Sequence, residues 1–184
     1  MSNAYTDIAF TPRVKSVQEQ MGSRATYAAW ETGPPGNQEL GETEREFIRA
    51  RDSFYMATVS QTGWPYLQHR GGPSGFIKVI DPSTLGFADF SGNRQYVSSG
   101  NLLDEDRVAL FLMDYPNQTR LKIFGHAIEI KPAPQGLFKA LELHDYRARV
   151  ERGFIIQIAG FDWNCRQHIT PRYSDAEWQA REKG

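Results

Sequence analysis

Apolar and polar residues alternate with the two-residue period of β-strands through much of the sequence after residue 53. Residues 54–60 and 64–70 are two such segments, and the short turn between them contains Gly63, which predicts a β-hairpin. Residues 76–80 and 84–90 predict a second hairpin, because the Asp-Pro-Ser sequence between them favours a tight turn. The strands of each hairpin are expected to be antiparallel neighbours.

Three further strands are predicted in the second half of the chain. Residues 107–114 are almost all apolar, as expected of a strand buried on both faces at the centre of the core, and residues 153–161 form a last apolar strand. Residues 119–130 alternate, and one of their faces mixes charge with an aromatic ring, which is not ordinary solvent surface. The residues on this mixed face are Arg120, Lys122, Phe124 and His126.

Helical patterns occur before, between and after these strands. Residues 14–31 have a short helical pattern that the following Gly-Pro-Pro-Gly-Asn sequence must end. Thr43 and Glu46 have the spacing of a capping box, which predicts a helix that plugs one end of a barrel. A short connecting helix is expected over residues 94–103, and a longer helical segment over about 134–151.

This order of elements predicts a mainly β fold with helical additions, in the α+β class. Hairpins in sequence favour an antiparallel barrel over a doubly wound parallel sheet. Residues 1–42 are expected to be a helical N-terminal lead-in and residues 43–184 the barrel domain, together forming one compact unit.

Composition excludes several classes of protein. The chain has 184 residues, with 21 Lys and Arg against 22 Asp and Glu, so no overall positive field is available to attract nucleic acid. No apolar run approaches the roughly 20 residues that span a bilayer, and no signal-peptide pattern opens the chain, so we expect a cytoplasmic protein without membrane contact. Cys165 is the only cysteine and the four histidines lack metal-ligand spacing, so no metal site is expected.

Arginine and glycine meet at two strand ends, which predicts an anion pocket. Arg70 precedes Gly71 and Gly72, which allow a bound group to approach the backbone closely. Asn93 and Arg94 precede the predicted short helix, whose first amides would also favour an anion. An arginine fork suits phosphate, although a surface ion pair and an ordinary tight turn are the alternative interpretations.

The order of the segments resembles the FMN-binding split barrels related to pyridoxamine 5'-phosphate oxidase. The resemblance covers residues 47–173, and it is carried by the segments HRGGPSGF, FADFSGNRQYVSSGNL, RVALFLMD, RLKIFGHA and WNCRQHITPRY. It implies an antiparallel split β-barrel that binds FMN. It also implies a homodimer with FMN at the subunit interface.

The resemblance assigns roles to particular residues. By motif position, it implies that Arg70 and Arg94 hold the FMN phosphate, and that Arg120 of one subunit reaches the flavin of the other. The residues implied to approach the flavin or its ribityl chain around the turn are Asp89, Ser91, Asn93 and Gln95. The anion pocket predicted from the glycine-containing turns contains the same two arginines.

The chain departs from the oxidase itself at several positions. Gln95 occupies a position where the oxidase has lysine, and Gly71 and Gly72 replace another of its lysines. In the oxidase tail an arginine and a histidine serve the substrate, and the Arg-Gln-His sequence ending at His168 is similar, but its surroundings differ. Trp163 begins a tail that could fold back over a flavin, which makes Trp163 a candidate cofactor contact and His168 a candidate for orienting substrate or transferring a proton.

Three functions are weighed against these residues. An FMN-dependent oxidoreductase acting on a small-molecule substrate is preferred, because the flavin supplies the chemistry and the protein supplies placement. The alternative is a binding or sensing protein that holds flavin, a deazaflavin or a tetrapyrrole without turnover. A phosphate-ester hydrolase is disfavoured, because no nucleophile with a base and no paired metal carboxylates occur at readable spacing.

Overall fold

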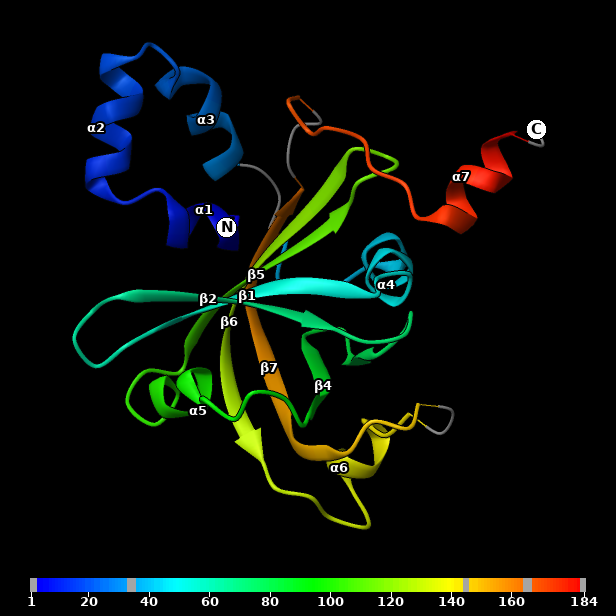
Figure 1. The fold of residues 1–184 in the computed structure, drawn as a ribbon. Helices are drawn as coiled ribbons and strands as arrows, with labels where there is room; N and C mark the ends of the chain where they lie inside the picture. The colour runs from blue at the N-terminus through cyan, green and yellow to red at the C-terminus, as the bar shows by residue number, and fades with distance from the viewer. Residues whose placement is uncertain (1–2, 33–35, 144–145, 164–166, 183–184) are drawn as a thin grey trace.

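Seven strands form one antiparallel sheet in the order β2-β1-β5-β6-β7-β4-β3 (Figure 1). The computed structural model describes residues 3–32, 36–143, 146–163 and 167–182. The strands are β1 (Ser53–Val59), β2 (Pro65–Gly71), β3 (Ile77–Asp81), β4 (Thr84–Phe90), β5 (Arg107–Asp114), β6 (Thr119–Ile130) and β7 (Val150–Trp163). The helices are α1 (Ala4–Ala9), α2 (Pro12–Gln20), α3 (Arg24–Glu31), α4 (Glu42–Arg49), α5 (Val97–Asn101), α6 (Leu137–Ala140) and α7 (Asp175–Glu182).

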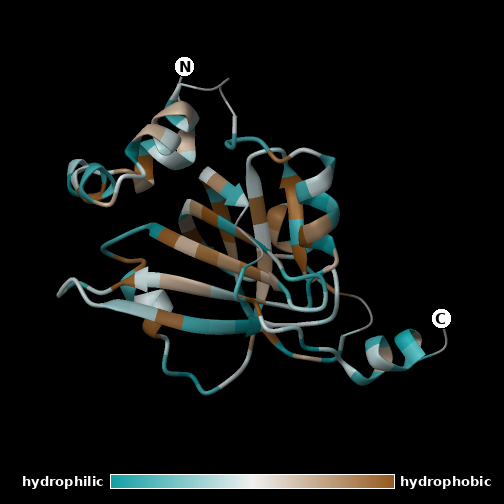
Figure 2. Cartoon of the chain, turned by 90° about the horizontal axis from the view of Figure 1, so that it is seen from above, coloured by the Kyte–Doolittle hydropathy of each residue, from teal (hydrophilic) through white to brown (hydrophobic). Residues whose placement is uncertain are grey.

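The sheet curls around one core and remains open between its edge strands β2 and β3. Alternate residues of β1 and β5 are buried, as the two-residue period requires, and the apolar positions gather on the central strands (Figure 2). Phe54, Phe87 and Phe154 are each at most 1% exposed and lie together in this core. The predicted antiparallel split barrel with helical additions is therefore confirmed.

The N-terminal helices stand beside the barrel, and α1 packs directly on β7 (Figure 1). A Cβ atom at Gly160 would lie 2.8 Å from the Tyr5 amide nitrogen, so only glycine allows the helix to approach this closely. The Tyr5 ring stacks on Phe124 with ring centres 5.2 Å apart, and the Tyr5 hydroxyl accepts a hydrogen bond of 2.6 Å from Lys122 Nζ. These contacts attach the lead-in to the outer surface of the sheet.

Helix α4 places Ile48, which is fully buried, in the barrel core. Its N-cap is Gly41, whose amide donates to the Glu44 carboxylate at 3.0 Å. The capping box predicted from Thr43 and Glu46 is therefore wrong by two residues. The helix starts earlier than predicted because Leu40, directly before the N-cap, is buried in the core at 2% exposure.

The helix predicted over residues 94–103 is shorter than expected. Arg94 and Tyr96 have φ angles of 58° and 54°, in the left-handed region, so the helix α5 begins only at Val97. The free amides of a helix start therefore do not follow Arg94 directly.

The helix predicted over residues 134–151 was also wrong, since α6 has four residues and the chain is already in β7 at Val150. Phe90 pairs with Val150, and Asp89 pairs with Arg152, across β4 and β7. Ladder hydrogen bonds to β4 thus override the helical charge pattern of this segment. Helix α7 was not predicted, although its start shows a capping box in which the Ser174 amide donates to the Glu177 carboxylate at 2.7 Å.

Strand β5 was predicted to be buried on both faces, and in the single chain this is wrong. Its residues alternate between buried and partly exposed, and Ala109 and Phe111 lie on the partly exposed face.

None of the helices in the described ranges has the length and apolar character needed to span a membrane.

Candidate functional site

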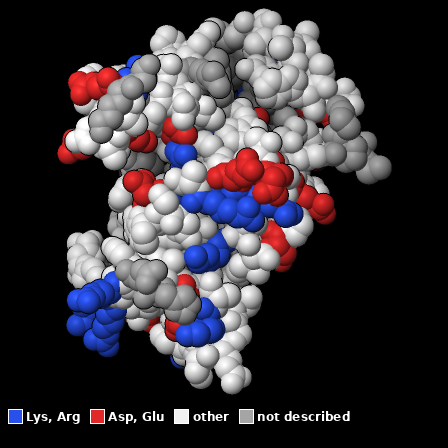
Figure 3. All heavy atoms as spheres, turned by 90° about the vertical axis from the view of Figure 1, so that its right-hand side faces the viewer, with Lys and Arg blue, Asp and Glu red and all other residues white. Residues whose placement is uncertain are grey.

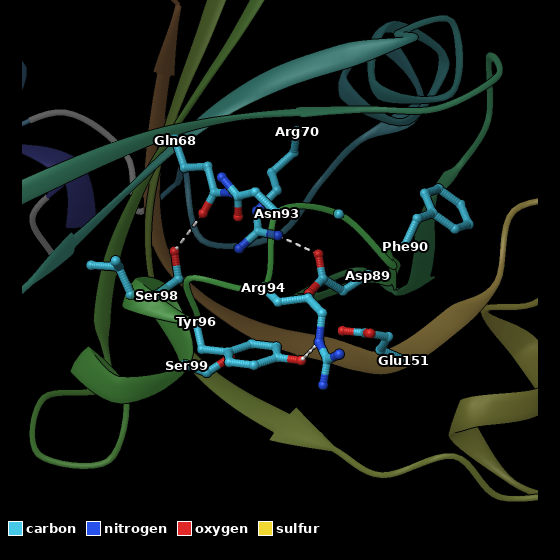
Figure 4. A pocket seen from close by; sticks show the side chains of 12 residues that line it. Gln68, Arg70, Asp89, Phe90, Asn93, Arg94, Tyr96, Ser98, Ser99 and Glu151 are labelled. Atoms are coloured by element: carbon cyan, nitrogen blue, oxygen red, sulfur yellow. Dashed lines mark hydrogen bonds and ion pairs between the residues drawn. The ribbon is translucent and has the colours of Figure 1, made fainter.

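A cavity of about 200 Å³ lies between edge strand β2 and strand β4, closed on one side by the loop from β4 to α5 (Figure 4). Strand β2 points Gln68 and Arg70 toward it, because residues two apart share one face of a strand. The twelve lining residues are Gln68, Arg70, Asp89, Phe90, Gly92, Asn93, Arg94, Tyr96, Val97, Ser98, Ser99 and Glu151.

Arg70 enters the cavity from the barrel interior. Its side chain is only 10% exposed, and its guanidinium carbon lies 5.2 Å from the centre of the Phe154 ring. Its Nη1 forms an ion pair with Asp89, whereas its Nε is buried without a hydrogen-bond partner among the described residues. Burial lowers the pKa of Arg70, but a guanidinium stays protonated at neutral pH. Arg70 is therefore charged, and its Nε remains a hydrogen-bond donor without an acceptor among the described residues.

Asp89 lies between two arginines. One carboxylate oxygen pairs with Arg70, and the other lies 3.3 Å from Arg152 Nε. Burial raises the pKa of Asp89, and the two guanidinium charges oppose this effect. Arg152 is itself held by Glu151 at 2.7 Å and by the Ser99 hydroxyl at 2.9 Å. The floor of the cavity is therefore a network of ion pairs.

Arg94 and Tyr96 form a wall of the cavity that is exposed to solvent. Arg94 Nε donates a hydrogen bond of 3.0 Å to the Tyr96 hydroxyl, and this contact raises the pKa of Arg94. Arg152 lies against the other side of Tyr96, with 4.5 Å between its guanidinium carbon and the ring centre. Two non-glycine residues with positive φ in three positions cost roughly 1–3 kcal/mol each, and such backbone strain is concentrated at functional sites.

The other residues proposed around this turn lie at or beside the cavity. Asn93 lines it, and its Oδ1 accepts a hydrogen bond from the Gln95 amide at 3.2 Å. The Ser91 hydroxyl donates to the Glu151 carboxylate at 3.0 Å, on the rim. Gln95 is exposed and does not line the cavity.

The two glycines after Arg70 have a structural explanation. A Cβ atom at Gly72 would lie 2.7 Å from the Phe76 ring, which is buried in the core. Gly71 ends β2 and lines a smaller cavity that Arg70 and Asp89 share with the larger one. The tight approach of Phe76 accounts for Gly72, while Gly71 remains beside the site.

Three predicted site residues lie away from this cavity. Arg120 is the second residue of β6, and its buried Nε has no hydrogen-bond partner within the described part of the chain. Trp163 ends β7 and donates from Nε1 to Glu44 at 2.7 Å. His168 is exposed in the tail, and the carbonyl of the next residue, Ile169, accepts from Gln118 Nε2 at 2.7 Å.

These three residues share the opposite end of the barrel. Strand β7 carries Arg152 near its start and Trp163 at its end, and Trp163 pairs with Leu121 beside Arg120. Eleven residues of strand extend for roughly 30 Å or more. Within one subunit, the cavity and Arg120 therefore lie at opposite ends of the barrel. Cys165 and Arg166, which belong to the tail segment WNCRQHITPRY, lie outside the described residues.

Several cavity residues were missed from the sequence. The two-residue period of β2 could have placed Gln68 on the same face as Arg70. Ser98 and Ser99 gave no signal, because serine is common in loops and caps. Glu151 lay in the segment assigned to a helix and Arg152 directly followed it, which concealed the pairing of Arg152 with Asp89 on β4.

The outer surface of strands β1, β2, β5 and β6 is apolar and hollowed. Tyr55 lies opposite Phe111, and Ala57 lies opposite Ala109, so their side chains share this outer face. Leu67 is 63% exposed on the same surface. We call this surface, with Lys122 and Phe124 at its border, the outer apolar face. Contiguous apolar surface of this kind is typical of protein interaction sites.

Charged residues of both signs lie next to one another on the face drawn in Figure 3. No group of three or more His, Cys, Asp or Glu side chains in the described ranges could hold a metal ion. The chemistry of the cavity thus rests on arginine, carboxylate, amide and hydroxyl groups.

An open antiparallel barrel with an arginine-lined cavity between β2 and β4 defines a split-barrel protein with a candidate anion site. The sequence model of the family described as pyridoxamine 5'-phosphate oxidase matches residues 40–152, which is more than half of the chain. The chain therefore belongs to the pyridoxamine 5'-phosphate oxidase family. No curated protein matches the sequence.

Solved structures show the same fold at low sequence identity. One is HupZ of Group A Streptococcus, with 14% identity and a TM-score of 0.55, covering 73% of this chain and 99% of that one. Another is described as a putative pyridoxamine 5'-phosphate oxidase of Lactobacillus delbrueckii, with 19% identity and a TM-score of 0.52, covering 69% of this chain and 96% of that one.

Proposed function

We propose that the protein is a cytoplasmic, homodimeric FMN-dependent oxidoreductase that acts on a small-molecule substrate. The observation that carries this proposal is that Arg70 and Arg94 line one cavity in a member of the pyridoxamine 5'-phosphate oxidase family. Both arginines would hold the FMN phosphate. Asp89, Asn93 and other groups of the turn would lie close to the ribityl chain.

The residues present fit a phosphate group. Arg70 has a buried Nε that no described residue accepts from, and a buried donor without a partner is rare in folded proteins. Asn93 adds an amide and Ser98 a hydroxyl at the same cavity. A volume of about 200 Å³ is below the range of about 300–1,000 Å³ for complete ligand sites. The cavity thus suits the phosphate end of FMN, and the remainder would extend beyond it.

A second copy of the chain would supply the rest of the site. The outer apolar face is suited to a two-fold interface, in which the same surface of each subunit packs against its counterpart. An axis perpendicular to the strands brings the Arg120 end of one subunit toward the cavity end of the other. Arg120, with its unpartnered Nε, would then complete the neighbouring flavin site. Two equivalent sites per dimer follow.

Mechanistically, bound FMN would supply hydride or electron transfer, which no side chain of the chain can perform. Arg70 and Arg94 would anchor the phosphate, and the Tyr96 hydroxyl would hold Arg94 in place. His168 is the candidate for proton transfer or substrate orientation, because an imidazole changes charge near neutral pH. Trp163, held by Glu44, would support the tail that carries His168.

A cofactor titration tests this proposal. Purified protein stripped of ligand is titrated with FMN, with a deazaflavin and with haem, and binding is followed by absorbance and by quenching of flavin fluorescence. One FMN per chain with higher affinity than the other two supports the assignment. Preference for haem or the deazaflavin refutes it.

Binding without turnover is the second candidate function. It is favoured by the composition of the cavity, since none of its twelve lining residues is histidine, cysteine or lysine. Stopped-flow reduction of the FMN-loaded protein by a panel of donors separates the two functions. An enzyme shows saturable reduction by one donor, whereas a binding protein shows only slow reduction common to free flavin.

A further inference from the structure

The arginine that faces the cavity from β2 is already paired with an acid. Arg70 contacts Asp89, and both side chains are at most 16% exposed. Around the cavity, the positive and negative side chains are equal in number. Two arginines, Arg70 and Arg94, and two carboxylates, Asp89 and Glu151, line it. The carboxylates of the cavity therefore neutralise its arginines before any phosphate binds.

Asp89 has a second position available to it. Arg152 Nε lies 3.3 Å from the free carboxylate oxygen of Asp89, yet this nitrogen is buried and makes no hydrogen bond within the described ranges. Arg70 Nε is unsatisfied in the same way. Each arginine thus holds one unused donor, and Asp89 lies between them with two acceptor oxygens.

We infer that Asp89 is a built-in competitor for the anion, which neutralises Arg70 until a phosphate monoester displaces it toward Arg152. This inference rests on the proposed function, because it concerns the same phosphate site. Displacement satisfies the donors on both arginines at once. Phosphate takes the guanidinium of Arg70, while the Asp89 carboxylate turns to Arg152 Nε.

The competition selects a class of ligand. A phosphate monoester carries a charge of about −1.5 to −2 at pH 7 and three acceptor oxygens, whereas a carboxylate carries one charge and two oxygens. Only the stronger anion gains enough from Arg70 to displace a carboxylate already held there. Asp89 would thus reject simple monoanions and allow phosphorylated ligands to bind.

The test compares FMN with riboflavin, which lacks the phosphate, in the wild type, Asp89→Asn and Glu129→Gln. Glu129→Gln is the matched control, since Glu129 contacts Arg152 at 3.5 Å but does not line the cavity. Asp89→Asn should tighten FMN binding by about tenfold or more, because a like charge no longer faces the phosphate. The ratio of FMN affinity to riboflavin affinity should therefore rise by about tenfold in Asp89→Asn, and in Glu129→Gln this ratio should stay as in the wild type.

The outcomes separate this inference from the proposed function. If the wild type binds neither FMN nor riboflavin, the proposed function fails and the role of Asp89 fails with it. If the wild type binds FMN but Asp89→Asn binds it equally or more weakly, only the role of Asp89 is refuted. If the variant does not fold, a crystal structure of the wild type with inorganic phosphate decides: Asp89 on Arg152 supports the inference, and Asp89 still on Arg70 overturns it.

Discussion

Replacing the two phosphate arginines should have equal effects on FMN binding and unequal effects on stability. Each of Arg70→Ala and Arg94→Ala removes charge-assisted hydrogen bonds, which should weaken FMN binding by about 1.5–3 kcal/mol, or about tenfold to a hundredfold. The difference arises in the protein without ligand. Arg70 is 10% exposed and paired with Asp89, whereas Arg94 is exposed and its Nε donates a hydrogen bond to the Tyr96 hydroxyl.

The structure sets the size of this difference. Removing one partner of a fully buried ion pair costs about 3–5 kcal/mol. Asp89 retains Arg152 at 3.3 Å, so the loss in Arg70→Ala should be smaller, about 1–3 kcal/mol, as for a single unsatisfied buried group. For a chain of this length each kcal/mol lowers the melting temperature by about 2–4 °C. Arg94→Ala should stay within about 0.5 kcal/mol of the wild type.

Fluorescence titration with FMN and thermal melting of the ligand-free proteins measure the two effects. Arg147→Ala is the control, because this arginine is exposed, does not line the cavity and removes the same charge. Wild-type FMN affinity in Arg70→Ala would refute the phosphate assignment. Equal melting temperatures for the two variants would refute the buried ion pair as the source of the asymmetry.

Three further predictions concern the dimer interface, the residue it would share between subunits, and the tail. Ala109→Arg places a charge on the outer apolar face and should give a monomer by light scattering at micromolar concentration, with FMN binding weakened because Arg120 of the other subunit is lost. Arg120→Ala should weaken FMN binding while leaving the dimer intact; a flavin-loaded monomer of the wild type would contradict both results. His168→Ala should retain FMN but slow reduction by substrate by roughly 100-fold, as expected for a group that only transfers a proton. Loss of flavin from this variant would identify His168 as a cofactor ligand instead.

The barrel and its arginines could be predicted from sequence because their signals are local. Alternation of apolar and polar residues identifies a strand within a few residues, and it also shows which side chains share a face. Arg70 could therefore be assigned to the end of β2. Arg94 was selected because it follows Gly92 and Asn93 in a turn. Both signals lie within a few residues of the arginine concerned.

The ion-pair network could not be predicted, since it depends on pairing between distant segments. Arg152 meets Asp89 because β7 pairs with β4, and the charge pattern before β7 indicated a helix instead. The left-handed conformations of Arg94 and Tyr96 were equally unpredictable, because neither residue type favours positive φ. Arg152 lies against the Tyr96 ring in this loop, and this contact also depends on the pairing of β7 with β4.

The apolar pattern of β5 has a physical consequence that connects the fold to the proposed dimer. Ala109 and Phe111 face outward from the single chain, beside Tyr55 and Leu67, although a strand with one solvated face normally carries polar residues there. Such a strand is selected when both of its faces are buried. The proposed second copy on the outer apolar face would provide that burial, and it would also bring Arg120 to the flavin site of the neighbouring subunit. The apolar pattern of β5, which does not fit the single chain, is therefore the pattern that the proposed two-fold assembly would require.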